Sequence, residues 1–151
     1  MSPSARTAGI APPRFNVAVH ILVWLAGAGG VCPSAEIASQ VPGHATFLRR
    51  VLAPLVQAGI VEAREGRVGG YSLARRAEKI SLADVYVALK AASLPDAAPP
   101  DQEEGGGEPG CPDRGERLDS LLGEVLFRAE QKALSFLSEV TIADLVREIE
   151  R

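Results

Sequence analysis

Four arginines stand in two closely spaced groups, Arg49 with Arg50 and Arg64 with Arg67, and their chemistry suits nucleic acid. A guanidinium group can donate two parallel hydrogen bonds to a guanine edge, or it can neutralise a phosphate. Residues 14–79 carry eight basic and four acidic side chains, whereas the whole chain has a net charge of −3. A positive segment within an acidic chain favours double-stranded DNA as a partner, although a merely solvated surface gives a similar balance.

Other reactive side chains are scarce. Cys32 and Cys111 lie far apart, with no second Cys or His at ligand spacing, so no metal site or disulfide framework is expected. Neither histidine has a nucleophile or paired carboxylate at a recognisable spacing, so we assign no catalytic residue and expect no enzyme. Cys32 is expected to be a small buried apolar residue. Cys111 is a candidate redox sensor, because a thiol in a polar loop is open to oxidants, or else a cysteine without a role.

The arginines are positioned by a helix, a turn, a helix, a strand, a glycine turn and a strand over residues 34–79. The pattern predicts a first helix at 34–40 with Ser34 as its N-cap, and a second from about His44 to Ala58. Pro42-Gly43 forces a sharp turn between them. Strands at 60–64 and 71–75 flank a glycine-bearing tip. This order predicts a winged helix-turn-helix, in a fold that is mainly α with a small β-wing.

The N-terminal end of a recognition helix is the part that reaches base edges and phosphates. Glycines in the wing let its backbone approach a phosphate, and arginines beside the tip suit the minor groove, although an ordinary hairpin would also use these residues. We therefore expect DNA contacts from His44, Ala45, Thr46, Phe47, Arg49, Arg50, Arg64, Arg67, Gly69, Gly70 and Tyr71.

The remaining composition divides the chain into four parts. Residues 1–13 are expected to be a disordered N-terminus, and residues 14–92 the winged helix-turn-helix DNA-binding domain. Its first helix, at 14–27, is apolar on two sides and needs cover on both, from later in the chain or from a second subunit. Residues 93–114 read as a flexible acidic loop rich in proline and glycine. Residues 115–151 are expected to hold a dimerisation helix and a C-terminal helix.

Apolar residues recur at helical spacing over about six turns near the C-terminus, and they give one continuous face. This face is wider than a small domain can cover, so we expect it to pack on a symmetric partner helix in a homodimer. The expected dimerisation residues are Leu118, Leu121, Leu122, Val125, Leu126, Ala129 and Phe136.

Two smaller signals complete the pattern. Ser81 with Asp84, and Thr141 with Asp144, have the spacing of capping boxes that begin two further helices. No apolar run reaches membrane-spanning length and no secretory signal is recognisable, so a cytoplasmic location without membrane contact is expected.

In this order, the motifs resemble the Rrf2 family of bacterial transcription regulators, from Phe15 to Val146. The resemblance is carried by LAPLVQAGIV at 52–61, GGYSLAR at 69–75, ISLADV at 80–85 and TIADL at 141–145. It implies a DNA-binding regulator, expected to be a repressor, that binds palindromic operators as a homodimer. It also implies that the long helix crosses to the partner subunit.

Two departures from the family pattern matter. Many members hold an iron–sulfur cluster on three cysteines spaced about C-x5-C-x5-C; here Cys111 matches the last, and Gly105 and Pro99 occupy the other two positions. One thiolate cannot hold a cluster that needs four ligands, so the chain resembles the cluster-free branch and no cofactor is expected. The family often has an arginine in the wing where this chain has Glu65.

Two other functions stay open at this stage. One is a thiol-based redox regulator acting through Cys111, and the other is a winged-helix protein-interaction module that does not bind DNA. A small-molecule effector is compatible with the sequence but is not identified by it.

Overall fold

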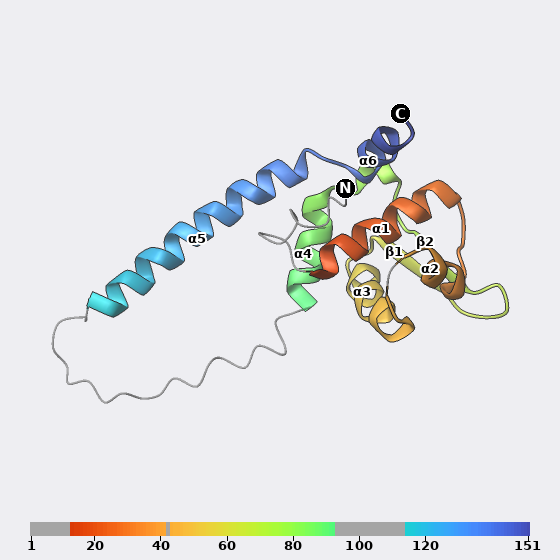
Figure 1. The fold of residues 1–151 in the computed structure, drawn as a ribbon, viewed down its shortest axis with the longest axis horizontal. Coiled ribbons are helices and arrows are strands. Elements are labelled where there is room, and N and C mark those ends of the chain that lie inside the picture. The colour runs from red at the N-terminus through yellow and green to blue at the C-terminus, as the bar shows by residue number, and fades with distance from the viewer. Residues whose placement is uncertain (1–12, 42, 93–113) are drawn as a thin grey trace, which may run out of the picture.

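A computed structural model describes residues 13–41, 43–92 and 114–151 (Figure 1). The predicted N-terminal segment up to residue 12, Pro42 and the acidic loop from 93 to 113 lie outside the described residues. The predicted fold class is confirmed, because the described part is helical apart from one two-stranded antiparallel sheet. The elements are α1 (Pro13–Ala28), α2 (Ser34–Gln40), α3 (Ala45–Gln57), β1 (Val61–Arg64), β2 (Gly70–Leu73), the 3-10 turn η2 (Ala77–Lys79), α4 (Leu82–Ala92), α5 (Arg114–Ser138) and α6 (Ile142–Ile149).

Hydrogen bonds between residues close in sequence define where the helices begin. Both predicted capping boxes are present: the Asp84 main-chain N–H donates to Ser81 Oγ (3.2 Å), and the Asp144 N–H donates to Thr141 Oγ1 (3.2 Å). The prediction that Ser34 caps α2 is wrong. Pro33 holds the N-cap position, its carbonyl accepts from the helix, and no side chain caps this end. Ser34 is therefore the first residue of the helix proper.

The core is built around α1. Its fully buried residues Ile21 and Leu22 belong to one cluster with Leu52 of α3, Leu89 of α4 and Ile142 at the start of α6. Helices α3, α4 and α6 all pack against α1. The helix that the sequence showed to be apolar on two sides is therefore covered in part by the last helix of the same chain.

The wing is joined to the segment before α2. Strands β1 and β2 pair in antiparallel register, and the main chains of Cys32 and Tyr71 exchange two hydrogen bonds of 2.8 and 2.9 Å. A Cβ atom at Gly70 would lie 2.1 Å from the Cys32 carbonyl oxygen. Glycine is required at this position because the two backbones touch. Cys32 is 3% exposed, which confirms its expected place in the core.

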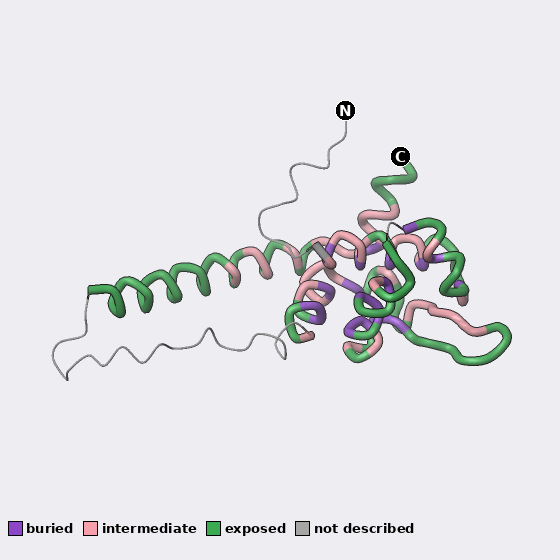
Figure 2. The backbone as a smooth tube through the Cα atoms, turned by 60° about the horizontal axis from the view of Figure 1, so that its bottom comes forward, coloured by how far each residue is buried: buried purple, intermediate pink, exposed green. Residues whose placement is uncertain are grey.

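Helix α5 projects from the body as an arm in both views of the chain (Figures 1 and 2). Its C-terminal half packs against α4, where Tyr86 Oη donates to Glu130 Oε1 (3.3 Å) and the Lys90 ammonium forms an ion pair with the same carboxylate. The chain then returns to the body, where Thr141 pairs with Ser81. Within the described residues, no helix is both long enough and apolar enough to span a membrane.

Candidate DNA-binding surface

Helix α3 divides cleanly into a buried side and an exposed side. Leu48, Val51, Leu52 and Leu55 lie inward, as the helical spacing of apolar residues predicts. The exposed residues at the N-terminal end are His44, Ala45, Thr46, Arg49 and Arg50, all of which are predicted DNA contacts. The burial of one side therefore places five predicted contacts on a single open end of the helix.

Phe47 differs from these neighbours, although the sequence assigned it to the same contact set. It is half-buried and packs against the core cluster. Gly43 in the preceding turn has φ 148°, and a Cβ there would lie 3.0 Å from the Phe47 ring. Phe47 therefore closes the turn between α2 and α3, and any contact with DNA would involve only its exposed part.

The N-terminal end of α3 is electrostatically positive. Its N-cap residue, His44, makes no side-chain hydrogen bond to the helix, and the first turn has no acidic residue. The first main-chain N–H groups of the helix lack a side-chain acceptor, and the helix dipole adds partial positive charge at this end. A phosphate oxygen can fill both roles.

The arginines of α3 and the wing are unpaired, unlike most arginines of the body. In the described part of the chain, no hydrogen bond or ion pair engages the side chains of Arg49, Arg50, Arg64 or Arg67, all of which are exposed. The arginines that do form ion pairs with carboxylates are Arg75, Arg76, Arg128, Arg147 and Arg151. Four guanidinium groups are therefore free to meet a ligand without breaking an internal contact.

The wing tip presents Arg64 and Arg67 around a tight turn. Gly66 has φ 110°, and the Gly69 main-chain N–H donates to the Gly66 carbonyl (3.0 Å). Inside this turn, Val68 is 87% exposed, a feature that the sequence pattern did not predict. An apolar residue inside a polar glycine turn was the available signal. Val68 and the two arginines form a tip with both apolar and cationic groups.

Gly69, Gly70 and Tyr71 lie at the base of the wing, where packing within the chain already explains them. A Cβ at Gly69 would lie 2.7 Å from the Arg64 carbonyl oxygen, in addition to the contact of Gly70 with Cys32. Tyr71 is half-buried and shares a hollow of about 200 Å³ with Ala45 and Arg49 of α3. This end of the wing therefore adjoins α3, and Arg64, which pairs with Gly70, lies beside it.

The seven predicted dimerisation residues all lie on α5 and are exposed in the single chain (Figure 2). The Leu, Val and Phe members are between 48% and 67% exposed. Phe127 is 60% exposed as well, and it lies on the opposite side of the helix, so the periodic pattern left it out. The arm thus carries an apolar stripe with a separate aromatic residue behind it.

The sulfur chemistry of the chain does not fit an iron–sulfur cluster. The sequence has two cysteines. Cys32 is buried, and burial, with a smaller effect of the Glu36 charge, raises the pKa of its thiol and disfavours the thiolate that binds metal. Cys111, the candidate sensor, lies outside the described residues. Within them, no group of three or more His, Cys, Asp or Glu side chains is placed to hold a metal ion.

Comparisons with known proteins give one consistent result. A family model described as "Rrf2: Iron-dependent Transcriptional regulator" matches residues 12–148. Protein aau3 of Rhizobium meliloti (strain 1021) is 40% identical over 73 residues, which cover 48% of this chain and only 47% of that protein. Among solved structures, IscR of T. potens has a TM-score of 0.65 at 20% identity, covering 94% of this chain and 89% of its own. The oxidized form of Staphylococcus aureus CymR has a TM-score of 0.62 at 19% identity, covering 91% and 96%. At these identities the two structures show a shared fold.

Proposed function

The chain belongs to the Rrf2 family of transcriptional regulators, and we propose that it binds operator DNA as a homodimer, with the N-terminal end of α3 in the major groove and the wing beside it. The proposal rests above all on the four exposed arginines of α3 and the wing that have no partner within the described chain. Guanidinium groups without an internal partner break no protein contact when they bind phosphate or guanine. The family consists of transcription regulators and not of enzymes, and the fold found here is theirs.

The proposed dimer forms through the exposed apolar face of α5. A symmetric pair of arms would remove this face from water, and a two-fold dimer presents its two recognition helices to a palindromic site. Half-sites of such a site lie about 34–36 Å apart, one turn of DNA. A dimer bound across a promoter would occupy DNA that the polymerase needs, so we propose repression as its effect, inside the cytoplasm where the operator lies.

The test of DNA binding starts from the purified full-length protein. Genomic fragments that it retains are sequenced, and the shared site is made as a labelled duplex for fluorescence anisotropy. We expect a palindromic site whose affinity falls steeply with salt. Recovery of unrelated fragments, with no shared site, would count against the proposal.

The same assay separates DNA binding from a protein-interaction role. Arg49→Ala combined with Arg50→Ala should weaken binding to the duplex by about tenfold or more, because both side chains lie on the exposed end of α3. Sedimentation of the variant should match the unmodified protein, since neither residue lies on α5. If the double variant binds the duplex as well as the unmodified protein, α3 is not the DNA-reading element. In vitro transcription from the selected promoter then tests repression.

A further inference from the structure

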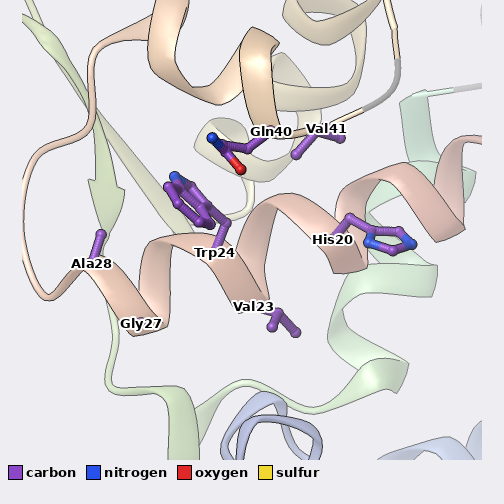
Figure 3. A pocket seen from close by; sticks show the side chains of 7 residues that line it. All are labelled: His20, Val23, Trp24, Gly27, Ala28, Gln40 and Val41. Carbon is purple, nitrogen blue, oxygen red and sulfur yellow. The ribbon is translucent and has the colours of Figure 1, made fainter. Parts of the chain in front are cut away.

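Val68 is the most exposed large apolar residue of the described chain, at 87%. Other apolar side chains near the surface are explained by packing within the chain. Val23 and Trp24, which line a hollow between α1 and α2, are half-buried, and Val41 in the same hollow is buried (Figure 3). Single exposed apolar residues are common on protein surfaces, so the exposure of Val68 gains meaning only from its position.

Val68 stands at the end of the wing. The turn runs from Gly66 to Gly69, which are joined by a main-chain hydrogen bond of 3.0 Å, and its two central residues are Arg67 and Val68. Both of these side chains are exposed. The segment that joins β1 and β2 projects from the body in both views of the chain (Figures 1 and 2). One cationic and one apolar side chain therefore lie next to each other where the wing meets solvent.

The charges around Val68 favour a polyanion as the partner. Arg64 and Arg67 are exposed, and neither has an ion-pair partner within the described chain. Glu65 is the only acidic residue from 64 to 69, so this segment has a net positive charge. Arginine is attracted most strongly to the narrow minor groove of A·T-rich DNA, where the negative potential is enhanced.

The turn also lies close to the proposed DNA-reading helix. Tyr71, which follows the turn, shares a hollow with Ala45 and Arg49 at the exposed end of α3. Major and minor grooves alternate along a duplex, so a wing beside a helix in the major groove reaches the adjoining minor groove. That groove is about 6 Å wide. A helix about 10–12 Å across cannot enter it, but the side chain of one turn residue can.

A valine side chain recognises a base pair by shape, because it can neither donate nor accept a hydrogen bond. In the minor groove, A·T and T·A pairs present only acceptors, and a G·C pair adds the 2-amino group of guanine. An apolar side chain packed against the groove floor would collide with this amino group and leave its donor without an acceptor, which costs free energy.

We propose that Val68 determines part of the sequence specificity, by packing against the floor of the minor groove and excluding the guanine 2-amino group. This inference rests on the proposed DNA-binding function. At the base pair under Val68, A·T and T·A should be accepted equally, because their minor-groove edges are alike, and G·C should be rejected. If the selected operators accept all four pairs equally at every position flanking the α3 contacts, the proposal is overturned.

Modified base pairs test the groove contact without changing the protein. In the labelled operator duplex, 2,6-diaminopurine replaces each adenine in turn, which adds the 2-amino group and leaves the major-groove edge unchanged. Uracil in place of thymine removes the major-groove methyl group instead. At the wing position, we expect diaminopurine to weaken binding about tenfold in fluorescence anisotropy and uracil to leave it unchanged. Diaminopurine without effect at every flanking position, or a loss with uracil alone, overturns the proposal.

Three variants separate the effect of Val68 from that of charge. Val68→Ala should bind the diaminopurine and unmodified duplexes about equally, because its shorter side chain does not reach the added amino group, whereas Val68→Ile should keep the discrimination. Glu65→Gln is the charge control, and it should strengthen binding to both duplexes alike. Within the described chain no residue other than glycine has a positive φ, so these substitutions cause no backbone strain. Full discrimination by Val68→Ala overturns the proposal.

Failure of this inference is distinguishable from failure of the proposed function. If the protein selects no operator, the proposed function fails and the role of Val68 fails with it. If Arg49→Ala with Arg50→Ala weakens binding to a selected operator that tolerates diaminopurine at every position, DNA binding by α3 stands and only the role of Val68 is overturned.

Discussion

Removing Arg49 and Arg50 together should change the salt dependence of DNA binding by a predictable amount. On α3 and the wing each protomer has four arginines without an internal partner, two on each element, so the proposed dimer has eight at this surface. If all eight contact phosphates, the logarithm of the binding constant should fall against the logarithm of salt concentration with a slope of about −7, since each phosphate contact contributes about −0.9. The double alanine variant loses half of these contacts, and its slope should be about −4 or shallower.

Fluorescence anisotropy with the selected operator duplex, between about 50 and about 200 mM salt, measures both slopes. The matched control is Arg147→Ala with Arg151→Ala, which removes the same charge from α6 and the residues that follow it. Both of these arginines are in exposed ion pairs, so their loss should cost little stability and leave the slope unchanged. Equal slopes for the two double variants would refute the reasoning, because net charge and not the position of the arginines would then set the affinity.

Three further predictions concern stability and assembly. Gly70→Ala should lower the free energy of unfolding, measured in urea, by about 1–3 kcal/mol, because the added Cβ would meet a main-chain oxygen. Gly27→Ala is the control, since its Cβ meets nothing within 4 Å and should not destabilise the protein. If the Gly70→Ala variant is as stable as the unmodified protein, this account of the wing is refuted. Hydrogen bonds from the main chain and side chain of Thr141 lower the pKa of Asp144 in the folded protein. The ionised carboxylate therefore stabilises the fold above its unfolded pKa of about 3.9, and this contribution is lost as pH falls through the folded pKa. The stability gap between the unmodified protein and Asp144→Asn should therefore narrow in urea titrations below about pH 4, and a constant gap would contradict this. Leu122→Glu should convert the proposed dimer to a monomer in sedimentation, while Phe127→Glu, on the opposite side of α5, should not; a dimeric Leu122→Glu would exclude this face as the interface.

Much of the fold could be predicted because its signals are local. Turn-forming residues on either side of α2 predicted its bounds. Both capping boxes were predicted because each consists of two residues three positions apart that hydrogen-bond to each other. The regular spacing of leucines predicted α5 for the same reason, since helical periodicity needs no knowledge of the rest of the chain. The exposed end of α3 follows from the buried stripe on its other side.

Features that depend on contacts distant in sequence could not be predicted. Gly70 was predicted as a DNA contact from its conformational freedom, but the sequence did not show that folding also brings the Cys32 carbonyl against it. The cover of α1 was ambiguous until Ile142 of α6 was found in the same core. The buried indole N–H of Trp24, which has no acceptor among the described residues, could not be read from the sequence either, because burial of a single atom depends on every neighbouring element.

The relation between α3 and α5 is set by contacts that run through the start of α4. Arg75 donates from Nε and Nη2 to the two main-chain carbonyls that follow α3, at 3.1 and 2.9 Å. Its guanidinium also lies 4.0 Å from the carboxylate of Asp84, which belongs to the capping box of α4. Arg75 therefore adds polar contacts to the direct packing of α3 on α4.

Helix α4 then holds the arm through Tyr86 and Lys90, which both contact the carboxylate of Glu130 on α5. Because that carboxylate accepts from both groups, its removal would release two contacts at once, and the packing of α5 on α4 is the most extensive contact that this arm makes with the body. In the proposed dimer the two α5 arms form the interface, and each recognition helix is joined to the arm of its own chain mainly through α4. The distance between the two recognition helices would thus depend on the Arg75 and Glu130 contacts within each chain as much as on the interface between the arms.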